Sequence, residues 1–169
     1  MKEIPYQQAI GSIMYLFKAT RPDLAYAIGS LSRYNTNYSV IHWQCVKNIF
    51  RYLQGTKRLK LCYSKSNTTI LEGFCDASLS KNIEDPRSVT GYVFLSQGGA
   101  TSWNSKRLKL SALSTVEAEL ISISIAAQEA TWLKDPATDL KLISVDYAVP
   151  LYSDSQGAIE LSRNANYSI

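Results

Sequence analysis

The chain has 169 residues, of which 46% are hydrophobic and 19% charged, so the sequence indicates a globular rather than a disordered protein. Its formal net charge of +4 is compatible with nucleic acid binding but does not indicate it, and the length fits one domain, or one domain with a subdomain. No apolar run approaches the roughly 20 residues that a membrane span needs. The three cysteines lack CxxC spacing, which argues against a disulfide framework or a zinc site and for reduced cysteines.

The first 55 residues predict three helices. Pro5 and Pro22 suit the first turns of two of them, and Gly55 is a suitable stop for the third. His42, the one histidine of the chain, lies in the third helix with no acidic neighbour in sequence, so we assign it a structural role. Apolar residues recur at helical spacing along this helix: Val40, Trp43, Val46, Ile49 or Phe50, and Leu53.

Beyond residue 57 the pattern predicts a mixed α/β sheet. Ser114 is a suitable N-cap for a long helix from Thr115 to Leu133, which we expect Pro136 to end. A strand–helix–strand crossover makes its two strands parallel, so the crossover strand should run parallel to a sheet whose first three strands are antiparallel. The expected strands are residues 58–64, 70–76, 88–99, 100–106 and 149–154, with a hairpin turn at Gly98-Gly99 and a last helix at residues 155–163.

Carboxylates follow two of the predicted strands. Asp76 comes at the end of "LEGFCD" and Asp154 at the end of "LYSD". If these strands are parallel neighbours, both side chains lie at the same edge of the sheet, where ligands of such sheets bind. The crossover helix offers a third acid from Glu117, Glu119 and Glu129.

A helical projection at about 100° per residue separates two of these glutamates. Glu119 falls on the edge of the predicted packing stripe, toward the sheet, whereas Glu117 falls on a polar face beside Ser124. An acid on a packing face is costly unless it is paired or bound to a metal, so Glu119 is the expected partner; the alternative is a helix-edge acid that reaches water. The predicted stripe consists of Val116, Leu120, Ile123, Ala127 and Ala130.

Three converging acids repel one another unless a cation lies between them. Oxygen-only sites suit Mg²⁺ or Mn²⁺. Two such ions about 4 Å apart activate water and stabilise the leaving oxygen in phosphodiester cleavage. The residues alone therefore make a magnesium-dependent nuclease one candidate function.

In their order along the chain, these motifs resemble the end of the Pol polyprotein of copia-type LTR retrotransposons. The stretch "YQQAIGSIMYLFKATRPDLAYAIGSLSRY…HWQCVKNIFRYLQGT", within residues 1–56, resembles the segment that closes the reverse transcriptase. The stretch "GFCDAS…STVEAEL…LYSDSQGAI", within residues 57–169, resembles the ribonuclease H domain of that family. The resemblance implies a ribonuclease H-like fold with an N-terminal helical subdomain.

The resemblance also implies an activity, partners and a site. Ribonuclease H of this family cuts the RNA strand of an RNA–DNA hybrid with Mg²⁺ (or Mn²⁺). Its partners would be the hybrid and the rest of the Pol polyprotein, without a membrane, inside the cell in a cytoplasmic virus-like particle or the nucleus. The matching catalytic and metal-binding residues are Asp76, Glu119 and Asp154, with Glu117 left open as an alternative to Glu119.

Five residues are candidates for nucleic acid contacts. The basic cluster of Lys106, Arg107 and Lys109 follows a predicted strand, and solvated loop charge is the alternative interpretation. Ser155 and Gln156 begin the last helix, where backbone N–H groups can approach a phosphate.

One departure from the family leaves the enzymatic activity open. The family carries a fourth acidic ligand after the last helix, and the domain in this sequence is shorter at its C-terminal end, without an equivalent. A degenerate, inactive fragment that at most binds nucleic acid is therefore the alternative function. A third hypothesis is an interaction module in which the three acids lie well apart.

Overall fold

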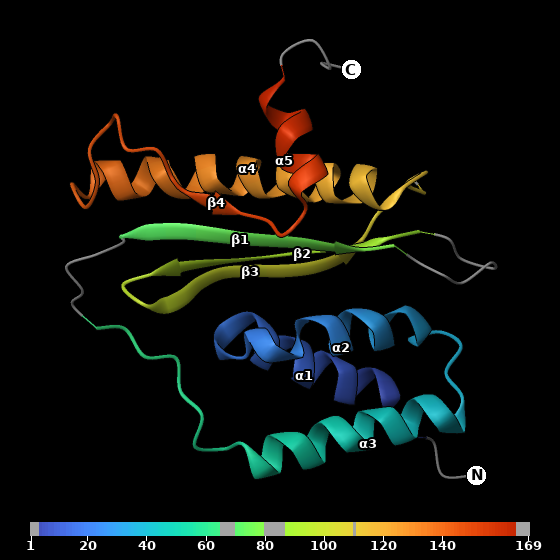
Figure 1. Ribbon diagram of the computed structural model, residues 1–169. Coiled ribbons are helices and arrows are strands. Elements are labelled where there is room, and N and C mark those ends of the chain that lie inside the picture. Colours follow the sequence, from blue (N-terminus) through green and yellow to red (C-terminus); the bar gives the residue numbers. More distant parts are fainter. Residues whose placement is uncertain (1–3, 65–69, 80–86, 110, 165–169) are drawn as a thin grey trace. The chain divides into compact units, whose positions relative to one another are not determined.

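The computed structural model describes residues 4–64, 70–79, 87–109 and 111–164 (Figure 1). The chain divides into two compact units, which we call the helical unit (Met1–Leu61) and the sheet unit (Cys62–Ile169) and describe separately. Among the described residues, no helix has the length and apolar character needed to cross a membrane.

The helical unit contains the three predicted helices. Its core forms where they meet, around Tyr6, Ile13, Ile28 and Val46, all essentially inaccessible to solvent. Tyr6 also donates a hydrogen bond from its hydroxyl to the carbonyl oxygen of Leu31, at 2.9 Å. The elements are α1 (Tyr6–Thr20), the 3₁₀ turn η1 (Pro22–Leu24), α2 (Ala25–Leu31), the 3₁₀ turn η2 (Ser32–Tyr34) and α3 (Val40–Gly55).

His42 has the structural role predicted for it, at the start of α3. Its Nδ1 accepts the backbone N–H of Ser39 at 2.9 Å, which completes a reciprocal capping box at the N-cap. The imidazole also stacks on the ring of Tyr34, with 3.8 Å between the centroids. Of the predicted apolar positions on α3, Val46 and Ile49 are buried, whereas Val40 is exposed.

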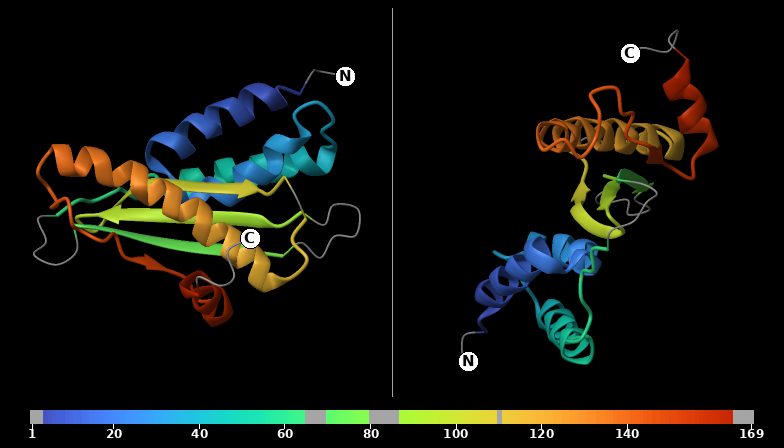
Figure 2. Two further views of the ribbon diagram at one scale, coloured as in Figure 1. Left: turned by 90° about the horizontal axis from the view of Figure 1, so that it is seen from above. Right: turned by 90° about the vertical axis from the view of Figure 1, so that its left-hand side faces the viewer.

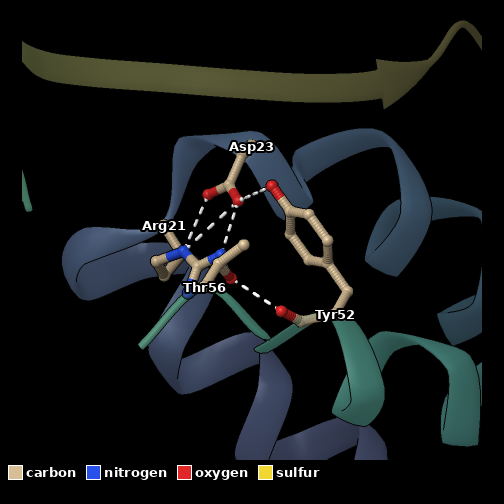
Figure 3. Close-up of polar contacts among 4 residues, drawn as sticks. All are labelled: Arg21, Asp23, Tyr52 and Thr56. Atoms are coloured by element: carbon tan, nitrogen blue, oxygen red, sulfur yellow. Dashed lines mark hydrogen bonds and ion pairs between the residues drawn. The ribbon is translucent and has the colours of Figure 1, made fainter. Parts of the chain in front are cut away.

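A polar cluster joins the start of η1 to the end of α3 (Figure 3). The guanidinium of Arg21, a side chain only 11% exposed, donates to Asp23 at 2.7 Å and to the hydroxyl of Thr56 at 2.8 Å. Tyr52 donates its hydroxyl to the same Asp23 carboxylate at 2.8 Å. The bonds from Arg21 to Thr56 and from Tyr52 to Asp23 connect residues 35 and 29 positions apart, so the cluster fixes α3 against the turn after α1.

The sheet unit has the predicted mixed sheet, with strand order β3-β2-β1-β4. The first three strands are antiparallel, and β4 is parallel to β1, as expected for a crossover through a helix. This arrangement is compatible with the predicted ribonuclease H-like fold. The elements are β1 (Leu71–Ser78), β2 (Val89–Ser96), β3 (Gly99–Arg107), α4 (Thr115–Asp139), β4 (Leu151–Tyr152) and α5 (Gln156–Arg163).

Helix α4 lies along one face of this sheet and crosses β1 and β2 (Figure 2). Its buried residues are Ala118, Glu119, Ser122, Ala126 and Ala130. The predicted packing stripe is therefore only partly correct. Ala130 is buried and Ile123 packs against the core, but the buried face is turned from the predicted one by roughly a quarter of the circumference, and Ala127 is exposed. The residues of α4 that face the sheet are small because large side chains of the sheet fill the space between the two layers. The fully buried ring of Phe94 belongs to the same core cluster as Ala126 and Ala130.

Gly73 allows the short strand β4 to lie against β1. A Cβ at this position would lie 2.4 Å from the Phe94 ring and 2.9 Å from Leu151. Gly73 pairs with Leu151 in the parallel register of β4, and this pairing is possible because glycine has no side chain.

Two local predictions in the sheet need correction. Residues 58–64 form no strand, because Tyr63 and Ser64 make single hydrogen bonds to Ala100 and Gln97 instead of a ladder. The hairpin turn is centred on Gln97-Gly98, both at positive φ, rather than on Gly98-Gly99. The Tyr63 ring lies against Gly99, where a Cβ would be 2.5 Å away.

Pro136 does not end α4, which continues to Asp139. Proline removes one helical hydrogen bond, and this loss falls in the last turn, where Thr138 Oγ1 donates to the carbonyl of Lys134 at 2.9 Å. Beyond the end of the helix, Lys141 has a left-handed φ of 55°, and the N–H of Leu142 donates to the carbonyl of Ala137 at 2.9 Å.

We expect Asp23→Asn to destabilise the helical unit by about 2 to 3 kcal/mol, because Arg21 would lose its charged partner in a largely buried position. The hydrogen bond from Arg21, with that from Tyr52, holds the pKa of Asp23 below its ordinary value against the opposing effect of burial. Its stabilisation is therefore present above the unfolded pKa and is lost as the pH falls through the folded pKa.

Urea unfolding between pH 3 and pH 7 measures this effect. The advantage of the wild type over Asp23→Asn should begin to decrease as the pH falls below about 4 and should continue to decrease toward pH 3. Tyr52→Phe, which removes only one hydrogen bond to the same carboxylate, should cost about 1 kcal/mol. Equal stability of Asp23→Asn and the wild type at pH 7 would contradict the proposed role of the cluster.

Candidate metal centre

The parallel pairing of β1 and β4 places two aspartates side by side. Phe74 pairs with Tyr152 in the register, and Asp76 and Asp154 follow two residues later on each strand. The sequence predicted Asp76 at the end of its strand, but it lies within β1. Asp154 lies after β4, immediately before Ser155, the N-cap of α5. Both aspartates are exposed.

Helix α4 supplies the third carboxylate. Glu119 is only 8% exposed, and it meets the two aspartates so that one oxygen from each residue lies within 4.8 Å of the others. Its Oε1 accepts the backbone N–H of Ala77 at 3.1 Å. Its Oε2 is buried and has no hydrogen-bond partner among the described residues. A buried carboxylate oxygen without a partner is costly, so this oxygen is a candidate ligand atom.

The other two candidate glutamates of α4 lie elsewhere. Glu117 accepts the backbone N–H of Leu113 at 2.6 Å, and its own N–H donates to the N-cap hydroxyl of Ser114, so it closes the start of the helix. Glu129 accepts the hydroxyl of Ser102 on β3 at 2.5 Å. Of the two residues left open by the sequence, the structure thus brings Glu119 and not Glu117 to the aspartates.

Burial and like charge act together on the carboxyl of Glu119. Burial raises the pKa of this carboxyl, and the nearby carboxylates of Asp76 and Asp154 raise it further, while the hydrogen bond from Ala77 opposes them. The three carboxylates are therefore not independent surface acids. The arrangement differs from that of the interaction module, in which the acids would lie well apart.

The potential ligand atoms of the Asp76–Glu119–Asp154 cluster are carboxylate oxygens. Cys75 lies next to Asp76, but burial and then the charges of Glu119, Asp76 and Asp154 raise the pKa of its thiol to about 11, so it remains protonated at neutral pH. The thiol donates to the carbonyl of Tyr152 at 3.5 Å instead. An all-oxygen set with an unpartnered buried oxygen fits a hard divalent cation such as Mg²⁺ or Mn²⁺ rather than zinc.

The predicted nucleic acid contacts fall into two groups. Lys106 and Arg107 are the last residues of β3, which lies two strands away from β1. Thr90 on β2 pairs with both Lys106 and Ala77, so the backbones of Lys106 and Ala77 lie about 10 Å apart across the sheet. Lys109 follows as an exposed residue. At the second group, the hydroxyl of Ser155 accepts the N–H of Ala158 as the N-cap of α5, and Gln156 is exposed.

Charge is distributed unevenly between the two units. The helical unit has nine Lys and Arg against two Asp and Glu, a net charge of +7. The sheet unit has nine against twelve, a net charge of −3. The modest overall charge of +4 therefore conceals a strongly basic unit of 61 residues, which the composition of the whole chain did not reveal.

Known proteins similar to this chain include two polyproteins of plant transposons. The retrovirus-related Pol polyprotein from transposon TNT 1-94 of Nicotiana tabacum is 46% identical over 167 residues, 99% of this chain and 12% of that protein. The Pol polyprotein from transposon RE2 of Arabidopsis thaliana is 34% identical over 159 residues, 94% of this chain and 11% of that protein. The chain thus spans about a ninth to an eighth of their length.

A shorter relative is similar along most of its own length. The secreted RxLR effector protein 161 of Plasmopara viticola is 44% identical over 133 residues, which are 79% of this chain and 94% of that protein. No family model matches the chain, and no solved structure matches it.

We expect Glu119→Gln to stabilise the metal-free protein by about 1 to 3 kcal/mol at pH 7, because it removes a buried charge beside two aspartates. The raised pKa of Glu119 means that its stabilising effect is present below the unfolded pKa and is lost as the pH rises through the folded pKa. With EDTA present, the free energy of unfolding of the wild type should therefore decrease, relative to that of Glu119→Gln, as the pH rises from the unfolded to the folded pKa of Glu119.

Thermal unfolding with EDTA and with 10 mM Mg²⁺ checks this expectation. Mg²⁺ should stabilise the wild type and leave Glu119→Gln unchanged. Glu117→Gln is the matched control, since it loses a charge at the helix N-terminus and should be destabilised by about 0.5 kcal/mol while keeping its response to Mg²⁺. A Glu119→Gln variant less stable than the wild type in EDTA would contradict the argument.

Proposed function

Because the chain belongs to the family that includes the retrovirus-related Pol polyproteins of transposons, we propose that its sheet unit is a ribonuclease H domain that cuts the RNA strand of RNA–DNA hybrids. The helical unit would then be the closing segment of the reverse transcriptase of a copia-type polyprotein. The observation that carries the proposal is the buried Glu119 Oε2, which has no partner among the described residues and belongs to a cluster with Asp76 and Asp154.

The three carboxylates have distinct parts in this proposal. Asp76 and Asp154, both exposed, would bind the cation from the solvent side, and Glu119 would bind it from the buried side through Oε2 while Ala77 holds Oε1. Divalent cations held in this way activate water for attack on a phosphodiester and stabilise the leaving oxygen. The like charges that repel one another in the metal-free protein would then be neutralised.

Basic residues would hold the nucleic acid backbone. Lys106 and Arg107 lie at the same end of the sheet as the carboxylates, and Lys109 follows them. The helical unit, taken by itself, has a net charge of +7. Such contacts neutralise phosphates without reading the sequence. Selection of the hybrid would depend on its shape and on contacts to the RNA 2′-hydroxyl groups.

An inactive fragment that at most binds nucleic acid is the second candidate function. It is favoured by the similarity to the Plasmopara viticola protein, which this chain covers over 94% of its length and whose name describes an effector rather than an enzyme. This candidate predicts hybrid binding, or no binding, without cleavage.

Incubation of the purified chain with labelled RNA–DNA hybrid and Mg²⁺ tests the proposal. We expect cleavage of the RNA strand and a loss of at least about 100-fold in Asp76→Asn, since even residues that only orient metal ligands contribute 10- to 100-fold. Asp139→Asn, an exposed acid at the other end of α4, is the matched control and should cleave normally. No cleavage by the wild type, or equal cleavage by Asp76→Asn, would refute it.

Binding of the uncleaved hybrid in Ca²⁺ tests the role of Lys106. We expect Lys106→Ala to weaken binding and to reduce the slope of log affinity against log salt by about 1, the effect of one lost phosphate contact. Lys141→Ala, at the far end of α4, should leave the slope unchanged. The same slope for Lys106→Ala and the wild type would exclude a phosphate contact by this lysine.

A further inference from the structure

Helix α4 binds both polar groups of a single peptide unit of β1. The N–H of Ala77 donates to Glu119 Oε1 at 3.1 Å, and the carbonyl of Asp76, in the same peptide unit, accepts the hydroxyl of Ser122 at 2.8 Å. The hydroxyl of Ser122 also lies 3.4 Å from the carbonyl of Gly91, the residue that faces Asp76 across β1 and β2.

The geometry of the peptide explains why two helix residues are needed. In a trans peptide the N–H and the C=O point in opposite directions, so one side chain cannot reach both. Glu119 and Ser122 are three residues apart and therefore neighbours on one face of α4. Ser122 is 1% exposed, so its hydroxyl has no water to replace the carbonyl of Asp76.

We infer that Ser122 is a positioning residue for the candidate metal centre. Together with Glu119 Oε1, its hydroxyl fixes the Asp76–Ala77 peptide unit on α4 and thereby sets the spacing between the carboxylates of Asp76 and Glu119. Metal ligands need placement within about 0.5 Å, and two hydrogen bonds from the helix that carries one ligand to the backbone of the other provide such a constraint. The inference rests on the metal site of the proposed function.

Ser122 did not stand out in the sequence, because a serine in a helix usually faces solvent or bonds to its own backbone. The signal was its spacing of three residues from Glu119 among alanines of the same face, Ala118, Ala126 and Ala130. That signal becomes readable only once the packing face of α4 is known.

Titration of the whole chain with Mn²⁺, followed by calorimetry, tests the inference without requiring cleavage. We expect Ser122→Ala to bind Mn²⁺ roughly 10- to 100-fold more weakly than the wild type, as for other residues that orient metal ligands. Ser124→Ala is the matched control: it lies on the same helix, two residues further on, and is exposed. Its Mn²⁺ affinity should equal that of the wild type.

Two further measurements separate positioning from general stability. Ser122→Cys retains a weak donor of similar size and should have intermediate affinity, which also covers the case in which Ser122→Ala fails to fold. In folded Ser122→Ala, hydrogen exchange of the Ala77 amide should be faster than in Ser124→Ala, while exchange in the β2–β3 hairpin stays the same.

The outcomes are distinct for the two proposals. Wild-type Mn²⁺ affinity in folded Ser122→Ala, or in Ser122→Cys if only that variant folds, overturns the inference and leaves the nuclease proposal intact. Weakened binding in these variants, with no cleavage of hybrid by the wild type, supports Ser122 as a positioning residue and refutes the catalytic proposal. No Mn²⁺ binding by the wild type overturns both.

Discussion

The contact between α4 and β1, with a carboxylate buried inside it, is the constraint on which the sheet unit depends. Small residues on α4 allow the helix to approach the sheet closely, and this approach brings Glu119 beneath the backbone of β1. A charged group in this position is costly in the absence of a cation. The fold therefore places a buried carboxylate beside Asp76 and Asp154, where a divalent ion would offset the cost of its burial.

The positions of the two aspartates also depend on the contact between α4 and β1, although indirectly. Because α4 is the crossover between β3 and β4, its position on the sheet makes β4 return parallel to β1. The absence of a side chain at Gly73 lets β4 lie close, and the capping of α5 by Ser155 fixes the chain directly after Asp154. Carboxylates that are 78 residues apart in sequence thus share one edge of the sheet.

The units differ in character as well as in charge. The helical unit is basic and is held by an apolar core and by the ion pair of the buried Arg21 with the more exposed Asp23. The sheet unit is acidic and carries the candidate metal site. The similarity to retrovirus-related Pol polyproteins of transposons is compatible with the nucleic acid substrate that we propose.

Much of this organisation could be predicted from local sequence. The helices of the first 55 residues, the β2–β3 hairpin and the crossover through α4 follow from periodicity, caps and turn residues, which are local properties. The predicted strand at residues 58–64 failed because alternation indicates an extended chain but not the neighbour needed for a ladder. The predicted stop at Pro136 failed because a proline in the last turn removes only one hydrogen bond.

The sequence by itself determined the order of the elements and the two aspartates that follow Phe74 and Tyr152 on parallel strands. Only the tertiary structure decided which face of α4 packs, that Glu117 closes the helix while Glu119 meets the aspartates, and that Ser122 holds the Asp76 carbonyl. The physical reason is that apolar residues occur nearly all round α4, so hydrophobicity does not select a face. The large side chains of the sheet select it, by leaving room only for small residues and for side chains that bond to its backbone.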